Sequence, residues 1–237
     1  MRGFNFLESV TANMTMTQST PKTRRNTPRL PDNLSPSLQA LLSQAPIKTY
    51  PSRTPIVNKG DVSSSMFFII SGSVAIISQK EGKRDIVLAY LNDGAFFGEM
   101  GLFENQPLRT ALVRTRVRSN IIEINYEQFL AFSKEFPELL FDLCSQLSFR
   151  LKETTRKVTD LTVLDVTGRI ARCLLDLSNQ PDAIPRPNGT QIHITRQEIG
   201  KLVGCSREMV GRVLKTLEDQ HTIKTSGKTI LIYKPEA

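Results

Sequence analysis

The stretch TRQEIGKLVGCSREMVGRVLKTL, residues 195–217, predicts two short helices joined by a tight turn. Thr195 and Glu198 have the spacing of a capping box, in which each side chain bonds the backbone N–H of the other residue. Gly204 can adopt the positive φ that such a turn requires, and Ser206 is a good N-cap for the second helix. Two short helices joined by a glycine-containing turn form a helix-turn-helix unit.

The second helix of this unit would expose charged side chains suited to reading bases. Arg207 and Glu208 lie in its first turn, the part that enters the major groove. Arginine can make a bidentate contact with guanine, and glutamate can accept a hydrogen bond from the cytosine amino group. The alternative is a solvated charged face on an ordinary helical hairpin. The predicted DNA-binding residues are Thr195, Arg196, Gln197, Ser206, Arg207, Glu208, Gly211, Arg212, Lys215 and Lys228.

A β-hairpin is predicted after these helices, over residues 222–233, with its turn at Ser226-Gly227-Lys228. It would make the unit a winged helix-turn-helix. Lys228 would then lie near a DNA phosphate, although a lysine in this turn could equally serve solubility. Upstream, residues 165–177 predict a helix, and a loop rich in proline, asparagine and glycine is expected over 180–189.

The sequence pattern is different between Tyr50 and Ile124, where short runs typical of β-strands alternate with residues typical of turns. The predicted strands are Met66–Ile70, Val74–Ile77, Ile86–Leu88 and Ile121–Ile124, and one of the turns is Glu81-Gly82-Lys83. Many short strands at close spacing predict a sandwich, roll or barrel. The leucines of residues 34–44 predict a short amphipathic helix before it.

One segment inside the β-region has the composition of a phosphate-binding site. Gly98 and Gly101 flank Glu99, and a helical turn from Met100 onward would offer free N–H groups to an anion. Arg109 supplies a bidentate fork for a phosphate, and the neighbouring Thr110 supplies a hydroxyl. The Glu99 carboxylate can accept from a sugar hydroxyl, so the set fits one phosphate fused to one ribose. The alternative is an internal ion pair between Glu99 and Arg109.

A long helix is predicted to open at Pro137, and it carries a narrow seam of apolar or small residues. The seam residues recur in steps of four and three: Leu140, Cys144, Leu147, Leu151, Thr154, Val158 and Leu161. This heptad pattern predicts a helix paired with a copy of itself, and hence a homodimer. The alternative is a helix packed on its own β-domain. Thr154 and the adjacent Thr155 place hydroxyls where a zipper would use leucine. Because a polar residue on the seam costs stability, these hydroxyls indicate a specific role.

Composition excludes several classes of function. The net charge of +8 favours an anionic partner. Three separated cysteines and two histidines argue against a disulfide framework or a metal cluster, and suit a reducing cytosol. We see no signal peptide, no membrane-length apolar run and no catalytic motif, so we expect a cytoplasmic protein that is not an enzyme, with no membrane partner. Residues 1–33 lack apolar periodicity and are expected to form a disordered tail.

From about residue 38 to 233, the chain resembles the cyclic-AMP receptor protein (catabolite activator) family of bacterial transcription regulators. The matching segments are Ser71–Val74, Gly98–Phe103, Arg109-Thr110, Leu164–Arg169, Gln180–Ala183, Thr195–Glu198 and Val203–Glu208. The resemblance implies an α+β protein of three parts. These are an N-terminal β-roll (a double-stranded β-helix or jelly roll) that binds cyclic nucleotide, a long dimerisation helix and a C-terminal winged helix-turn-helix. We place the boundaries at 1–33 for the tail, 34–136 for the β-roll, 137–164 for the helix and hinge, and 165–237 for the DNA-binding domain.

The resemblance also implies the ligand and its contacts. Cyclic AMP would be the allosteric ligand, with no metal. Its ribose and cyclic phosphate would be held by Gly98, Glu99, Arg109 and Thr110, and Arg150 would reach toward the phosphate. Thr154 and, from the opposite subunit, Thr155 would contact the adenine. The predicted ligand-binding residues are Gly98, Glu99, Met100, Arg109, Thr110, Arg150, Thr154 and Thr155.

The implied partners are double-stranded DNA, a second copy of the chain and RNA polymerase. A two-fold dimer would read a palindrome of TGTGA-like half-sites, and a loop near 183–191 would face the polymerase. The sequence departs from the family pattern in two ways that bear on the ligand. Thr110 and Thr155 each stand where serine is usual, which keeps the hydroxyl, and residues 105–108 lack the usual charged run. A related group that binds cyclic di-GMP has an acidic residue after the arginine, and Thr110 argues against that ligand.

Overall fold

The computed structural model describes residues 30–31, 34–79, 85–104 and 107–234. These residues fall into two compact units, and the boundary between them lies between Thr155 and Arg156. The predicted disordered tail, apart from Leu30 and Pro31, lies outside the described residues, as does the predicted turn at Glu81–Lys83. In the part of the chain described, no helix is long and apolar enough to cross a membrane.

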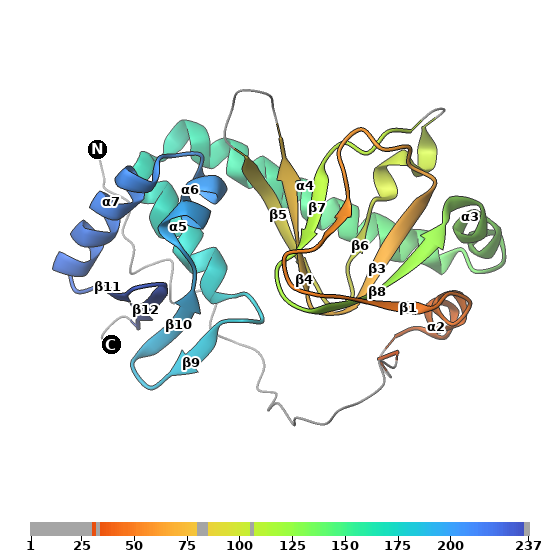
Figure 1. Ribbon diagram of the computed structural model, residues 1–237, viewed down its shortest axis with the longest axis horizontal. Coiled ribbons are helices and arrows are strands. Elements are labelled where there is room, and N and C mark those ends of the chain that lie inside the picture. Colours follow the sequence, from red (N-terminus) through yellow and green to blue (C-terminus); the bar gives the residue numbers. More distant parts are fainter. Residues whose placement is uncertain (1–29, 32–33, 80–84, 105–106, 235–237) are drawn as a thin grey trace. The chain divides into compact units, whose positions relative to one another are not determined.

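The first unit contains two four-stranded antiparallel sheets, which form the β-roll of Figure 1. One sheet has the order β1-β8-β3-β6, and the other has the order β2-β7-β4-β5. The first consists of β1 (Ile47–Tyr50), β8 (Ser119–Asn125), β3 (Ser65–Ser71) and β6 (Phe96–Phe97). The second consists of β2 (Pro55–Val57), β7 (Leu112–Thr115), β4 (Ser73–Ser78) and β5 (Ile86–Asn92).

Strand β3 shows why this sequence forms two layers. Its side chains alternate between two cores because successive residues of a strand point to opposite faces. Phe67 and Ile69 join a core that includes residues of both sheets. Met66 and Phe68 join a second core that contains residues of three helices. Both faces are therefore buried, which explains the uninterrupted apolar run of the sequence.

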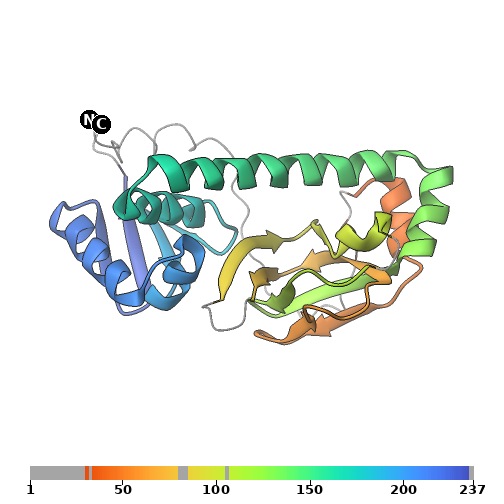
Figure 2. The same cartoon turned by 90° about the horizontal axis from the view of Figure 1, so that it is seen from above.

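The second core is built from the short helices and the start of the long one. The helices are α2 (Pro36–Leu42), α3 (Tyr126–Glu135) and α4 (Glu138–Val163). Leu41, Phe129 and Leu139 are each 0% exposed within it. In Figure 2 the helices α2 and α3 lie beside the N-terminal end of α4. This arrangement lays the first half of α4 along the sheet edge that carries β6.

The second unit contains α5 (Val166–Ser178) and the two predicted short helices, α6 (Arg196–Val203) and α7 (Arg207–Asp219). Asp165 caps α5 by accepting a hydrogen bond from Gly168 N at 2.7 Å. A four-stranded sheet of order β11-β12-β10-β9 completes the unit. Its strands are β9 (Ile184–Arg186), β10 (Gly189–His193), β11 (Ile223–Ser226) and β12 (Thr229–Tyr233).

The structure confirms the predicted helices and strands with small shifts at their ends, and it corrects one loop. The segment 180–189 was expected to be irregular, but it contains β9, whose Ile184 pairs with Gln191 of β10. Pro185 masks this strand in the sequence because proline cannot donate to a sheet ladder. It is tolerated here because β9 is the end strand of its sheet. The predicted hairpin is correct but forms only half of the sheet.

Candidate functional site

The predicted phosphate-binding segment forms a tight turn at the end of β6. Gly98 has a φ of 77°, in the left-handed region that favours glycine, and precedes a short 3-10 helix from Glu99 to Phe103. A Cβ atom at Gly98 would lie 2.8 Å from Arg109 Nη1, so any other residue here would displace the guanidinium. The glycine therefore allows a carboxylate and a guanidinium to lie next to the same turn.

Arg109 is 9% exposed and is held by the fold on several sides. Its Nη1 donates to Ser65 O at 2.7 Å and to Gly98 O at 3.1 Å, and its Nη2 donates to Ser65 Oγ at 3.1 Å. The guanidinium carbon also lies 5.4 Å from the centre of the Phe67 ring. These contacts fix the orientation of the guanidinium. Sequence reasoning missed Ser65, a serine within a strand that nothing in the pattern distinguishes.

Glu99 is paired with Arg150 rather than with Arg109. The Glu99 carboxylate is 7% exposed, and its Oε1 accepts from Arg150 Nη1 at 3.0 Å. Arg150 comes from α4, and its Nη2 also donates to Phe96 O and to Gln146 Oε1. The structure therefore contradicts the expected alternative of a Glu99–Arg109 ion pair. It brings Glu99, Arg109 and Arg150 together around the Gly98 turn.

The remaining predicted ligand residues are exposed. Thr110 donates to Met100 Sδ at 3.6 Å, which places both side chains at the outer rim of the same turn. Thr154 and Thr155 lie on α4, and each donates its hydroxyl proton to the carbonyl oxygen four residues earlier. The distances are 2.8 Å to Arg150 O and 2.9 Å to Leu151 O. Both threonines are exposed on α4.

The predicted seam of α4 is largely uncovered in the isolated chain. Leu151, Val158 and Leu161 are 68%, 57% and 59% exposed. The side chains of α4 that are buried belong to a different stripe, with Leu139 and Leu143 at 0% and 1% exposure. The helix therefore packs on its own β-roll with one stripe, against which Leu140 and Leu147 of the seam are also partly buried. The later part of the seam is left for another contact.

The helix-turn-helix has the local structure that its sequence predicts. The capping box is complete, because Glu198 N donates to Thr195 Oγ1 at 3.1 Å and Thr195 N donates to Glu198 Oε2 at 3.0 Å. Gly204 ends α6 with a φ of 76°, and Ser206 caps α7 by accepting from Met209 N at 3.1 Å. These caps fix where each helix starts and therefore which side chains α7 exposes.

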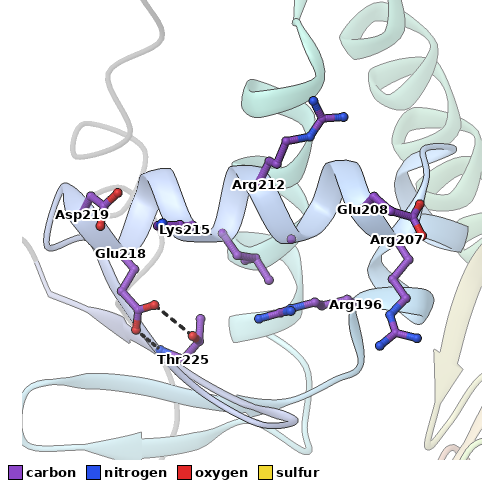
Figure 3. A pocket seen from close by; sticks show the side chains of 10 residues that line it. Arg196, Arg207, Glu208, Arg212, Lys215, Glu218, Asp219 and Thr225 are labelled. Carbon is purple, nitrogen blue, oxygen red and sulfur yellow. Dashed lines mark hydrogen bonds between the residues drawn. The ribbon is translucent and has the colours of Figure 1, made fainter.

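An open groove of about 830 Å³ runs along α7, as Figure 3 shows. Arg207 and Glu208 lie at one end of it, and Arg196 reaches in from α6. Six predicted DNA-binding residues line the groove: Arg196, Arg207, Glu208, Gly211, Arg212 and Lys215. The other predicted residues do not line it. Thr195 and Ser206 serve as caps, Gln197 lies in the first turn of α6, and Lys228 lies in the exposed turn between β11 and β12.

The groove also shows a contact that sequence reasoning missed. The Glu218 carboxylate accepts from Thr225 N at 2.8 Å and from Thr225 Oγ1 at 3.0 Å, drawn as dashed lines in Figure 3. Chiefly because of the backbone hydrogen bond from Thr225, the pKa of Glu218 is lowered from its usual value. The pair joins the end of α7 to β11. Its seven-residue separation gave no signal because the hairpin register was unknown.

The described residues offer no chemistry of a metal centre. No group of three or more histidine, cysteine, aspartate or glutamate side chains among them could hold a metal ion. The cysteines Cys144, Cys173 and Cys205 are free. Burial raises the pKa of the Cys173 thiol to about 12, which disfavours its nucleophilic thiolate form. The described residues instead gather arginines in two places, beside the Gly98 turn and along α7.

Two family models match the two units separately. Residues 47–136 match the cyclic nucleotide-binding domain, and residues 168–237 match the Crp-like helix-turn-helix domain. The first match covers the Gly98 turn and Arg109, and the second covers α6, α7 and the hairpin. The order of the two matches is the order of the two sites described above.

Curated relatives cover most of the chain. It is 49% identical over 199 residues to the cAMP-activated global transcriptional regulator Vfr of Pseudomonas aeruginosa, covering 83% of this chain and 93% of Vfr. It is 47% identical over 198 residues to the cAMP-activated global transcriptional regulator CRP of Salmonella typhimurium, covering 84% and 94%. These proteins are regulators and not enzymes.

A solved structure of similar sequence has the same fold. The c-di-GMP responsive global regulator CLP of Xanthomonas campestris superposes with a TM-score of 0.78 at 42% identity, covering 83% of this chain and 98% of CLP. The matches extend through both units and the helix between them. From the two domain matches and the identity across almost the full length of its relatives, this chain belongs to the CRP family of transcription regulators.

Proposed function

We propose that this chain is a cyclic-AMP-responsive global transcription regulator and that its ligand binds at the Gly98 turn. The observation that carries the proposal is the convergence of the buried Glu99 and Arg109 with Arg150 around one turn. Arg109 offers a fixed cation to the cyclic phosphate, and the Glu99 carboxylate can accept from the ribose hydroxyl. The proposed ligand residues are Gly98, Glu99, Met100, Arg109, Thr110, Arg150, Thr154 and Thr155.

The proposed functional form is a homodimer that pairs through α4. The exposure of Leu151, Val158 and Leu161 supports this, because a helix leaving such a seam in water would lose the free energy of burying it. Thr154 interrupts this seam, and Thr155 is adjacent to it. Adenine contact by Thr154 of one subunit and Thr155 of the other would explain the two hydroxyls, since the ligand and the dimer would then share one surface.

The dimer binds double-stranded DNA, and α7 is the proposed reading helix. Arg207, Glu208 and Arg212 would contact base edges of a TGTGA-like half-site, and the two-fold axis would match a palindrome. Thr195, Arg196, Gln197, Ser206, Gly211, Lys215 and Lys228 complete the proposed contact set, chiefly toward the backbone. RNA polymerase is the further partner, and we propose that the β9–β10 hairpin, within residues 183–191, contacts it.

The ligand would act by shifting a population between two arrangements of the dimer. It can do so only if its affinity differs between them. Contacts with Thr154 and Thr155 would re-pack α4 near residues 160–165 and orient both copies of α7 for one face of DNA. We retain the boundaries 1–33, 34–136, 137–164 and 165–237 as proposals, and we propose that the protein acts in the cytoplasm.

Fluorescence anisotropy on a palindromic TGTGA-type duplex tests this function. The experiment titrates cyclic AMP at fixed salt, because phosphate contacts make DNA affinity steeply dependent on salt. Cyclic AMP should tighten binding to this duplex and leave binding to a scrambled duplex weak. Equal affinity with and without cyclic AMP would refute the switch and leave the DNA-binding role standing.

Cyclic di-GMP is the second candidate ligand, favoured by the similarity to CLP. The same titration with cyclic di-GMP distinguishes the two. If cyclic di-GMP, and not cyclic AMP, changes the affinity for DNA, the ligand assignment is wrong while the site and its allosteric role remain.

A further inference from the structure

One stripe of α4 changes from apolar to polar where it meets the ligand turn. Leu139 and Leu143 are buried in the core, and Gln146 and Arg150 follow on the same stripe at the same four- and three-residue steps. The first pair anchors the helix on the β-roll. The second pair lies against β6, the strand that leads directly into Gly98.

Gln146 and Arg150 bond backbone groups of β6 that a further strand would otherwise pair. Strand β6 is an end strand of its sheet, and Phe96 within it is 0% exposed. Its backbone N–H donates to Gln146 Oε1 at 2.9 Å, and its carbonyl accepts from Arg150 Nη2. Without these partners, a buried N–H and a buried carbonyl would lose their hydrogen bonds.

Gln146 also fixes its neighbours on either side. Its Nε2 donates to Gly94 O at 3.0 Å, and its Oε1 accepts from Arg150 Nη2 at 3.2 Å. The Gln146 amide therefore bonds the backbone of Gly94, before β6, and of Phe96, within it. It also bonds one terminal nitrogen of the Arg150 guanidinium, whose other terminal nitrogen bonds Glu99. A carboxylate could accept in this position but not donate, and an aliphatic side chain could do neither.

We propose that Gln146 is a positioning residue for the ligand site, acting through Arg150 and β6 without touching the ligand. It holds Arg150 so that one nitrogen meets Glu99, and it holds the strand from which Gly98 and Glu99 extend. The carboxylate oxygen of Glu99 that is not paired with Arg150 is then presented to the ligand in a fixed direction. This inference rests on the proposed binding of cyclic AMP at the Gly98 turn.

The test measures the dissociation constant of cyclic AMP by calorimetry on the full-length protein. Gln146→Leu removes every hydrogen bond of the amide, and we expect about a tenfold weaker affinity. Gln146→Glu keeps the acceptor and adds a charge that competes with Glu99 for Arg150, so it should also weaken binding. Gln128→Leu is the matched control, since the Gln128 amide bonds the exposed Gln44 side chain on α2's C-terminal flank, away from the turn.

A double-mutant cycle separates positioning from loss of stability. If Gln146 acts through Arg150, adding Gln146→Leu to Arg150→Leu should cost much less affinity than Gln146→Leu alone. Fully additive losses would overturn the route through Arg150, and wild-type affinity in folded Gln146→Leu would overturn the whole proposal. Failure of the wild type and of Gln128→Leu to bind cyclic AMP would instead overturn the proposed function and this inference together.

Discussion

The Gly98 turn and the α7 groove each contain arginines that we propose bind a phosphate-bearing ligand, but the two sites hold them in opposite ways. Arg109 is 9% exposed and bonds Ser65 and Gly98 of its own fold. Arg207 and Arg212 lie on the open face of α7, in a groove that Figure 3 shows. Arg109 is therefore a buried residue of the β-roll, whereas Arg207 and Arg212 are exposed on the surface of α7.

This difference determines what a substitution can damage. In the Gly98 turn, binding groups also satisfy buried backbone carbonyls, so ligand affinity and stability share the same atoms. On α7, the helix is held by its caps and its apolar face, and we expect exposed side chains such as Arg207 and Arg212 to be replaceable with little effect on either. We therefore expect the turn to act as a preorganised site, and the exposed arginines of the groove to be replaceable without loss of stability.

Arg109→Leu should have the largest effect, because it damages both functions of the buried guanidinium. It removes the fork for the phosphate and deprives Ser65 O and Gly98 O of a donor. We expect cyclic AMP affinity to fall at least about a hundredfold, and the free energy of unfolding to fall by about 2–4 kcal/mol. Calorimetry and urea unfolding measure the two quantities.

Arg109→Lys sharpens this prediction because it keeps the charge and loses the planar fork. It should recover less than half of either loss, expressed as free energy. If Arg109→Leu lost affinity with unchanged stability, the contrast between core and surface sites would be broken.

Arg207→Ala should have a smaller effect, confined to DNA. The affinity for a TGTGA-type duplex should fall by about 1–3 kcal/mol because a base contact is lost. The free energy of unfolding should stay within about 0.5 kcal/mol of the wild type, since the side chain is exposed. Anisotropy and urea unfolding on one preparation test both, with Arg53→Ala in the β-roll as an exposed arginine control. A marked fall in stability would show that the arginines of α7, like Arg109, are part of what holds the fold together.

The smallest effect is expected for Glu218, which tests whether the groove is wholly free of structural roles. Its pKa is lowered in the folded protein, so its contribution to stability is present above its usual pKa of 4.5 and is lost as the pH falls through the lower folded value. Glu218→Gln should remove that acid-side dependence. The free energy of unfolding is measured between about pH 3 and pH 6 for wild type and variant. If the Thr225 contact contributes nothing, this free energy would depend on pH in the same way in both proteins.

The sequence predicts the α7 site better than the Gly98 site for a physical reason. Caps, a glycine turn and a helical period are local rules, so Thr195, Gly204 and Ser206 predicted the two helices and the outward side chains. The partners of Arg109 and Glu99 come from other strands and from α4. Their identities depend on sheet register, which no local pattern reveals, and the Glu99–Arg109 alternative was wrong for this reason.

The missed elements follow the same rule. Strand β9 was hidden by Pro185, whose place at a sheet edge is a tertiary fact. Gln146 lies at the helical spacing of Arg150, but only the position of β6 shows what its amide bonds. The heptad seam was visible because it repeats along one helix, and its exposure in the isolated chain agrees with the predicted pairing.

The threonine hydroxyls of α4 have a consequence for which purine ring can lie against them. Thr154 and Thr155 each donate their single proton to the carbonyl one turn earlier. At the proposed adenine contact the Thr154 oxygen would then act as an acceptor, so a ring edge that bears an amino group would be matched and one that bears a carbonyl oxygen would be repelled. Because the helix backbone takes up the Thr154 proton, we expect this surface to favour a 6-aminopurine over a 6-oxopurine.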